Sequence, residues 1–268
     1  MITADYHVHT SFSSDSEAPM ESMIEKAISM GFQRICITDH MDYDYPKQYN
    51  LPFIFDPEPY AKQILELKQV YKDDIKVLMG IECGMQPHLV SRYQALLSQY
   101  DFDFVICSSH LAKGMDMYYP EYWEGMSEEE GYRAYFSAIL DNIRCFDNFD
   151  VYGHLDYVVR YGPSKGENFH YELYADMFEE ILKELIARGK GIELNSAGYK
   201  YGLGRPHPTP EILKRYKELG GTILTIGSDG HKPEHLAYDF ATARELLLSL
   251  GYTQYTVFEK RQPIFLDL

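Results

Sequence analysis

The sequence predicts an α/β fold in which seven β–α units form one closed or distorted barrel, a single domain spanning residues 1–268. Short apolar runs alternate with longer amphipathic segments along the whole chain, and no break in composition divides it. Strands that alternate with helices favour parallel pairing through right-handed crossovers. Residues of metal-binding type also end every apolar run. An open, doubly wound sheet is the structural alternative, because a strand count alone does not exclude it.

The seven apolar runs have strand length, are rich in Val and Ile, and are bounded by Gly, Asp or Ser. They cover residues 2–9, 34–40, 76–82, 102–110, 149–156, 191–195 and 222–231. Helical patterns lie between them, at residues 19–30, 57–72, 126–146, 171–189, 210–221 and 233–251. Ser127 is the expected N-cap of the third helix. We expect loops over one face at 41–56 and 113–124, and an apolar tail, 260–268, packed against the barrel.

The composition limits the possible partners. A formal net charge of −16 argues against a long nucleic acid, whose phosphates would be repelled. A small phosphorylated substrate is compatible with this charge, because bound divalent metals reverse the field inside a pocket. No charged and apolar leader opens the chain, and no apolar stretch reaches the roughly 18 to 20 residues that a bilayer span needs. We therefore expect a cytoplasmic protein without a membrane partner; the oligomeric state is not predicted.

The residues that end the predicted strands are the most informative feature. In chain order they are His7 and His9, Asp39 and His40, Glu82, His110, His154 and Asp156, Glu193 and Asn195, and Asp229 and His231. In a parallel barrel the carboxyl ends of the strands form one rim, where active sites lie. A single histidine at a strand end is more often a hydrogen-bonded structural residue. Six of the ten histidines on one rim indicate a site instead.

The spacing of these residues predicts metal binding. Residues i and i+2 of a strand point to the same face. His7 and His9 are therefore expected to hold one ion together, with Asp5 beneath them as a supporting partner. Asp229 and His231 likewise share a face. Imidazole and carboxylate ligands without a thiolate suit zinc, manganese or iron.

The ordered set H-x-H, T-D-H, G-I-E, S-S-H, G-H-x-D and S-D-x-H resembles the polymerase and histidinol phosphatase (PHP) superfamily. The similarity runs from the first predicted strand to the last and covers nearly the whole chain. Within the superfamily, the chain looks like the stand-alone enzymes that hydrolyse L-histidinol phosphate in histidine biosynthesis. The resemblance implies a distorted (β/α)7 TIM-like barrel, three divalent metal ions and phosphomonoesterase activity.

The resemblance also assigns ligands to each ion. Those of the first ion would be His7, His9, Glu82 and Asp229. Those of the second would be Glu82, bridging the two ions, with His110 and His154. Those of the third would be His40, His231 and Asp15, the last at a position where many relatives carry histidine. The alternative for Asp15 is an N-cap of the helix that begins near Pro19.

The expected mechanism is in-line attack on phosphorus by a hydroxide that bridges two of the ions. The residues expected to act in catalysis are Asp229, His231 and Glu82. The resemblance implies that Arg160, Arg205 and His207, on loops over the same rim, contact the phosphate. For each arginine, an ordinary surface ion pair is the alternative.

Other rim residues are interpreted as supporting groups. Asp39 and Asp156 are expected to orient imidazoles, as outer partners of metal ligands commonly do. Glu193 has the same role or belongs only to the barrel interior. A cationic amino-alcohol head would suit the acidic, tyrosine-rich segment 41–49.

Three other functions stay open. The nearest is another PHP-type activity, on a nucleoside monophosphate or a short oligonucleotide. An amidohydrolase that cleaves C–N bonds also begins with H-x-H on a barrel strand, but it often uses a bridging carboxylated lysine, and no lysine ends a predicted strand here. A non-enzymatic barrel would have lost ligands, whereas every expected position holds a competent residue.

Overall fold

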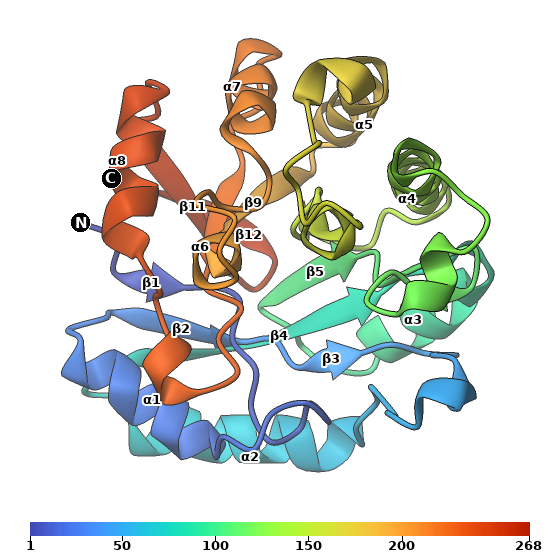
Figure 1. Ribbon diagram of the computed structural model, residues 1–268. Coiled ribbons are helices and arrows are strands. Elements are labelled where there is room, and N and C mark those ends of the chain that lie inside the picture. The colour runs from blue at the N-terminus through green and yellow to red at the C-terminus, as the bar shows by residue number, and fades with distance from the viewer.

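Seven strands form a mostly parallel sheet that is nearly closed into a barrel, in a computed structural model that describes residues 1–268 (Figure 1). Around the sheet they are β1 (Ala4–Asp5), β2 (Arg34–Ile37), β4 (Lys76–Gly84), β5 (Phe104–Ser108), β8 (Val151–Tyr152), β9 (Gly191–Asn195) and β10 (Leu224–Gly227). Each pairs in parallel with the next one along the chain, as successive β–α–β units do. The predicted barrel is confirmed, and the open doubly wound alternative is wrong.

The first and last strands of this sheet meet just beyond β1. The Tyr6 amide donates to the Ile226 carbonyl at 3.1 Å, and the His9 amide donates to the Gly230 carbonyl at 2.9 Å. Val8 and Gly230 form a parallel bridge. These bonds close the sheet, and because all seven strands are parallel, their carboxyl ends face one side of the molecule.

Helices lie around the outside of the sheet (Figure 1). They are α1 (Met20–Ser29), α2 (Pro57–Val70), α3 (Val90–Leu97), α4 (Glu128–Cys145), α5 (Ala175–Ala187), α7 (Pro210–Glu218) and α8 (Phe240–Ser249). The one-turn helix α6 (Ala197–Lys200) instead follows β9 at the carboxyl end of the barrel. Short 3₁₀ helices are η1 (Lys47–Tyr49), η2 (Pro87–Leu89), η3 (Pro120–Trp123), η4 (Tyr157–Tyr161), η5 (Tyr171–Tyr174) and η6 (Pro233–His235). The main helices bury one apolar stripe against the strands, as Phe178, Ile181, Leu182 and Leu185 of α5 do.

The start of α4 is as predicted and the start of α8 is not. Ser127 accepts from the Glu130 amide at 3.2 Å, while the Glu130 carboxylate accepts from the Ser127 amide at 2.7 Å, so both groups are capped reciprocally. The helix expected over 233–251 begins only at Phe240. Ala237 and Asp239 have φ values of 52° and 53°, a left-handed conformation that no helix turn accommodates.

The carboxyl-terminal segment forms an antiparallel hairpin, β11 (Gln254–Glu259) and β12 (Gln262–Asp267), at the amino end of the barrel. The Tyr6 hydroxyl donates to the Phe258 carbonyl at 2.8 Å, and the Leu224 amide donates to Thr256 Oγ1 at 3.1 Å. The tail therefore packs against the barrel as expected, but as a regular strand paired with a neighbour that the sequence analysis missed.

The two predicted loops are largely irregular but contain short elements. The first begins with β3 (His40–Met41), which pairs in parallel with β4 and places His40 opposite Glu82. The second follows β6 (Leu111–Ala112) and contains β7 (Met115–Asp116), which together form a two-stranded hairpin. None of the helices is both long enough and apolar enough to cross a membrane.

Candidate metal centre

The carboxyl rim of the barrel gathers all nine predicted metal ligands. His7 and His9 directly follow β1, Asp15 lies in the loop before α1, and His40 begins β3. The other five members of the set are Glu82 near the end of β4, His110 after β5, His154 after β8, and Asp229 and His231 after β10. Eight of the nine are supplied by strand ends, because parallel strands direct their carboxyl termini to one rim.

The Glu82 carboxylate lies at the centre of this cluster. Its Oε2 atom is 3.2 Å from His7 Nε2, 3.5 Å from His9 Nε2 and 2.8 Å from His40 Nδ1. Its Oε1 atom is 3.2 Å from His110 Nε2 and 2.9 Å from His154 Nε2. Each oxygen of Glu82 thus faces a different group of imidazoles. This is the geometry expected of a carboxylate that bridges two ions.

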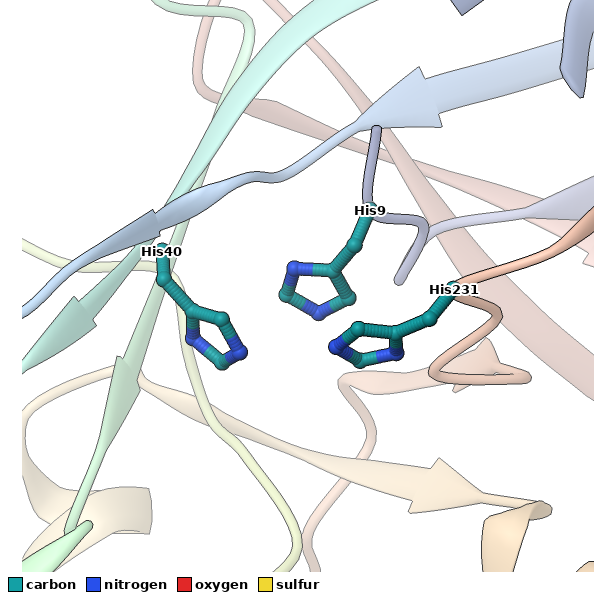
Figure 2. Close-up of side chains that lie close together, drawn as sticks. All are labelled: His9, His40 and His231. Atoms are coloured by element: carbon teal, nitrogen blue, oxygen red, sulfur yellow. The ribbon is translucent and has the colours of Figure 1, made fainter. Parts of the chain in front are cut away.

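A further group of imidazoles lies on the solvent side of Glu82. Figure 2 shows the rings of His9, His40 and His231 turned toward one another, and the His9 ring stacks on the other two at centroid distances of 4.2 Å and 4.1 Å. Asp15 Oδ2 lies 3.1 Å from His231 Nε2 and 3.7 Å from His40 Nε2. Asp15 therefore joins the group to which the family pattern assigns it, and the position of this carboxylate does not match a simple helix cap.

The atoms that would face metal ions are buried and lack hydrogen-bond partners. They are His7 Nε2, His9 Nε2, His40 Nδ1, Glu82 Oε2 and His231 Nε2. A buried polar atom without a partner costs on the order of 1–3 kcal/mol, and coordination to a cation would satisfy these lone pairs. Imidazoles and carboxylates without a thiolate fit divalent zinc, manganese or iron. The residues therefore fit a multinuclear metal centre.

Carboxylates and imidazoles of the cluster shift one another's pKa. Despite burial, the neighbouring carboxylates raise the pKa of His7 and His110 well above the usual value and that of His40 to about 9, so a bound cation would displace these protons. Burial alone would raise the pKa of Glu82, but the imidazoles of His7, His110 and His40 outweigh it and hold this pKa well below its usual range. Burial and the neighbouring His231 and His40 lower the pKa of His9 well below the usual value. Glu82 is thus ionised and His9 neutral, as metal ligands must be.

Outer hydrogen bonds fix the orientation of three imidazoles. His7 Nδ1 lies 2.6 Å from Glu193 Oε1, and His110 Nδ1 lies 2.6 Å from Asp42 Oδ2. His9 Nδ1 lies 3.1 Å from Ser13 Oγ, whose hydroxyl donates to Asp39. Since these acceptors hold the Nδ1 proton, the Nε2 lone pair of each ring faces the cluster. Glu193 therefore orients an imidazole.

Asp42 is the residue that the sequence analysis missed. It is 4% exposed, and its carboxylate contacts both His110 and the Gly84 backbone, where a Cβ atom would lie 2.4 Å from Asp42 Cγ. A signal was present in the sequence, because Asp42 follows His40 at the same i+2 spacing that joins His7 to His9. The Pro, Tyr and Asp residues of segment 41–56 indicate an irregular loop, and they conceal the strand-like spacing of His40 and Asp42.

The structure overturns the role assigned to Asp5 and specifies those of Asp39 and Asp156. Asp5 is not a partner of the imidazoles; it accepts from the Ser228 amide and hydroxyl at 3.0 Å and 2.5 Å, and from the Ala237 amide at 3.0 Å. It therefore ties β1 to the loop after β10. Asp39 reaches an imidazole only through Ser13. Asp156 does orient an imidazole, but that of His207, 2.5 Å away.

The three predicted phosphate contacts differ in their surroundings. Arg205 Nη1 donates to Asp156 Oδ2 at 2.8 Å, and His207 donates to the other oxygen of the same carboxylate. Burial opposes ionisation of Asp156, yet His207 and Arg205 hold its pKa at about 2. Arg160 instead contacts the hydroxyl of Tyr161, and its Nε and Nη1 atoms are buried without a hydrogen-bond partner. Of the two arginines, only Arg160 carries a charge that no carboxylate neutralises.

A cavity of about 410 Å³ adjoins the cluster beneath segment 41–56. Its lining includes Asp42, Asp44, Tyr43, Tyr45 and Phe53. Two of these residues reach the cluster, because Asp42 contacts His110 and the Phe53 ring lies edge-on to His40 at 5.3 Å. The acidic, tyrosine-rich segment named in the sequence analysis thus lines a hollow beside the imidazoles.

A parallel barrel whose carboxyl rim gathers six imidazoles and three carboxylates defines a metal-dependent barrel enzyme. A profile of the PHP domain family matches residues 5–197. The chain belongs to this family.

Similar proteins of known name agree with this assignment. The chain is 31% identical to a histidinol-phosphatase of Lactococcus lactis, over 95% of this chain and 93% of that protein. It is 33% identical to a probable histidinol-phosphatase of Clostridium acetobutylicum, over 96% and 97% of the two chains. The crystal structure of the Lactococcus lactis histidinol phosphate phosphatase complexed with zinc, L-histidinol and phosphate superposes with a TM-score of 0.89 at 29% identity, covering 98% of both chains.

Proposed function

We propose that this chain is a metal-dependent phosphomonoesterase that hydrolyses L-histidinol phosphate to L-histidinol and phosphate, a step of histidine biosynthesis. The observation that carries the proposal is the convergence of nine ligand-type side chains on Glu82, in a chain similar over nearly its whole length to a histidinol-phosphatase. The related crystal structure holds zinc together with L-histidinol and phosphate, the two products of this reaction.

The proposed centre holds three divalent ions, zinc being the ion that the relative binds. The grouping of the side chains supports the assignment expected from the family pattern. His7, His9 and Glu82 form one group of mutually close ligand atoms, and Glu82, His110 and His154 form another. His40 and His231 form the third group, and their ligand atoms lie close to that of His9. We assign Asp229 to the first ion and Asp15 to the third.

Ions bound at these groups would lower the pKa of water toward 7 and neutralise charge on the phosphoryl oxygens. The side chains of the cluster would hold these ions close together and supply the negative charge that binds them. Glu82 is shared between two groups, and the pKa of Asp229 is held well below its usual range because His7, His9 and His231 outweigh the effect of burial. The His231 side chain is 18% exposed, its Nε2 lies 3.1 Å from Asp15 Oδ2 and its Nδ1 lies 3.0 Å from the Asp229 carbonyl. It would therefore hold the third ion at the open side of the cluster, where the leaving alkoxide would depart.

Groups outside the cluster would bind the two ends of the substrate. Arg160 is the primary phosphate contact, because its buried N–H groups have no other partner. Arg205 and His207 reach the same region while anchored on Asp156. The ammonium group of histidinol phosphate would suit the Asp42 and tyrosine side of the adjoining cavity, away from Lys47 and from Arg92, which pairs with Asp44.

The whole chain is proposed to form one functional domain. The family profile ends at residue 197, but Asp229 and His231 of the cluster lie beyond it, after the strand that closes the barrel. A cytoplasmic location and the exclusion of long nucleic acids stay predictions from composition.

A substrate panel tests the proposal. The zinc-loaded and manganese-loaded protein should hydrolyse L-histidinol phosphate with a kcat/KM roughly a hundredfold above that for p-nitrophenyl phosphate or nucleoside monophosphates. The reason is that a site which hydrogen-bonds polar substrate groups rejects compounds that lack them. Equal or better hydrolysis of a nucleoside monophosphate would favour the alternative PHP-type activity and refute the proposed substrate.

A further inference from the structure

Tyr201, at the end of α6, contacts two cations beside the proposed metal centre. The Arg160 guanidinium carbon lies 4.1 Å from the centroid of the Tyr201 ring, and the Lys200 ammonium lies 4.8 Å from it. Lys200 forms no ion pair; its Nζ donates to the main-chain carbonyl of Asp229 at 3.2 Å. Because Asp229 belongs to the cluster, both cations lie at the edge of the proposed reaction site.

Arg160 is enclosed by aromatic rings on other sides as well. Tyr157 and Tyr161 of η4 each place a ring centroid 4.6 Å from its guanidinium carbon. The Tyr157 ring also lies 4.7 Å from the His154 ring. One aromatic ring therefore separates Arg160 from a proposed metal ligand. This places its guanidinium within reach of a group bound at the cluster.

Aromatic faces hold a cation without cancelling its charge. A ring attracts a guanidinium or ammonium through its quadrupole. A carboxylate instead accepts from the N–H groups of an arginine and neutralises its charge, as Asp156 does for Arg205. The buried Nε and Nη1 atoms of Arg160 thus stay available to an anion. The tyrosines restrict where the guanidinium lies but leave its hydrogen-bonding capacity free.

We propose that Tyr201 is a positioning residue that holds Arg160 and Lys200 beside Asp229 as two unneutralised cations for the phosphoryl group. This inference rests on the proposed function, since it requires a phosphate ester at the cluster. It adds Lys200 to the phosphate contacts that the sequence suggested. It also assigns a function to Tyr201, whose ring is otherwise half-exposed at the mouth of the site.

The test compares Tyr201→Leu with the matched control Tyr201→Phe, which keeps the ring and removes only the hydroxyl. Inorganic phosphate is the probe, with its affinity for the zinc-loaded protein measured by calorimetry and by competitive inhibition. Tyr201→Leu should weaken phosphate binding and raise KM about three- to tenfold, with a smaller change in kcat, because a cation–ring contact of this kind is lost. Tyr201→Phe should stay within about twofold of the natural protein. Zinc content is measured in each variant, and it should not change.

A double-mutant cycle separates positioning from a general packing effect. Arg160→Lys replaces the planar guanidinium and should itself weaken phosphate binding. If Tyr201 acts mainly through Arg160, the Tyr201→Leu change should have a clearly smaller effect in the Arg160→Lys background. A packing role would leave the two effects additive.

Three results would overturn the inference: unchanged phosphate affinity in Tyr201→Leu, an equal loss in Tyr201→Phe, or strict additivity in the cycle. Failure of the proposed function looks different, since the natural zinc-loaded protein would then neither hydrolyse histidinol phosphate nor bind inorganic phosphate. If the natural protein binds phosphate and Tyr201→Leu binds it equally well, only the positioning inference fails.

Discussion

The two ends of the barrel are built from the same seven strands, yet their buried carboxylates have opposite kinds of partner. At the amino end, Asp103 accepts from Lys68 Nζ at 2.7 Å and Asp150 accepts from Arg261 Nε at 2.6 Å. At the carboxyl end, the charged neighbours of Glu82 and Asp229 are imidazoles, and the Ser108 hydroxyl donates to Glu82 at 2.7 Å. Asp156 is the buried carboxylate of this end that pairs with an arginine, Arg205. The chain neutralises its own acids where it needs stability. At the carboxyl end, the carboxylates and imidazole lone pairs of the cluster stay available to bind metal cations.

The two ends of the barrel also differ in apolar packing. The amino end is covered by the β11–β12 hairpin, whose Phe258 lies 5.1 Å from Phe104, which in turn meets Tyr6 edge-on at 5.3 Å. The carboxyl end is covered by loops and by the short helix α6, with a cavity of about 410 Å³ lined mainly by segment 41–56. We therefore expect substitutions at the amino end to change the free energy of unfolding, and those at the carboxyl end to change metal content and activity.

The largest effect is expected from His9→Ala at the carboxyl end. His9 lies in two of the groups of close ligand atoms, so its loss should deplete bound metal and lower kcat/KM on the order of a thousandfold or more. The free energy of unfolding of the metal-free protein should change little. Metal analysis, steady-state kinetics and denaturant unfolding check these points, and retained activity with a lowered metal content would refute the metal mechanism.

At the amino end, Phe258→Ala should reverse that pattern. Removing a buried ring leaves a cavity that costs about 3–5 kcal/mol of unfolding free energy. Since the ring lies at the opposite end of the strands, kcat/KM of the folded, metal-loaded protein should stay within about twofold. Urea unfolding and kinetics at a temperature where the variant is folded measure the two quantities; a large loss of kcat would contradict the separation of the two ends.

A smaller effect should follow Asp42→Asn, which keeps the size of the side chain but weakens its hold on the His110 Nδ1 proton. Loss of such an outer partner typically costs about ten- to a hundredfold in metal affinity. Competitive chelator titration should show weaker binding of one ion, with the unfolding free energy of the metal-free protein nearly unchanged. Unaltered metal affinity would mean that Asp42 merely fills space beside Gly84.

The smallest predicted effect is that of Arg261→Ala, which leaves Asp150 buried without its cation. Burial raises the pKa of Asp150 even with Arg261 present, so the carboxylate is costly when ionised, and the variant should lose about 1–2 kcal/mol at neutral pH. Protonation of Asp150 favours the folded state, so this deficit should shrink as the pH falls from about 7 toward 5. Unfolding curves across that range would contradict the prediction if the deficit grew on acidification.

Most of the barrel was predictable because each strand and helix carries its own periodicity and boundary residues. The β11–β12 hairpin was not, since its turn uses Lys260 and Arg261 at φ values of 48° and 64° instead of the Asn-Gly type of signal. β1 is also shorter than the predicted run, since beyond Asp5 the backbone keeps only isolated hydrogen bonds, such as that from the His9 amide to the Gly230 carbonyl.

The ligands were predictable for a different reason. Strand ends share one rim in a parallel barrel, so residue type at each end predicted a rim that contains eight of the nine among other polar residues. The family resemblance then singled out these eight as ligands and added Asp15. Asp42, Lys200 and Tyr201 were missed because Asp42 follows the two-residue strand β3, and Lys200 and Tyr201 end the one-turn helix α6. Elements this short show no periodicity in the sequence, and their placement depends on tertiary contacts.

The central claim is that this rim binds several metal ions around Glu82 and receives a phosphoryl group there. Crystals of the zinc-loaded protein soaked with phosphate, measured at the zinc absorption edge, test it most directly. We predict three anomalous peaks among the nine ligands, two of them flanking Glu82, and a phosphate contacted by Arg160. Zinc absent from these side chains, or a phosphate bound away from the cluster, would contradict the account.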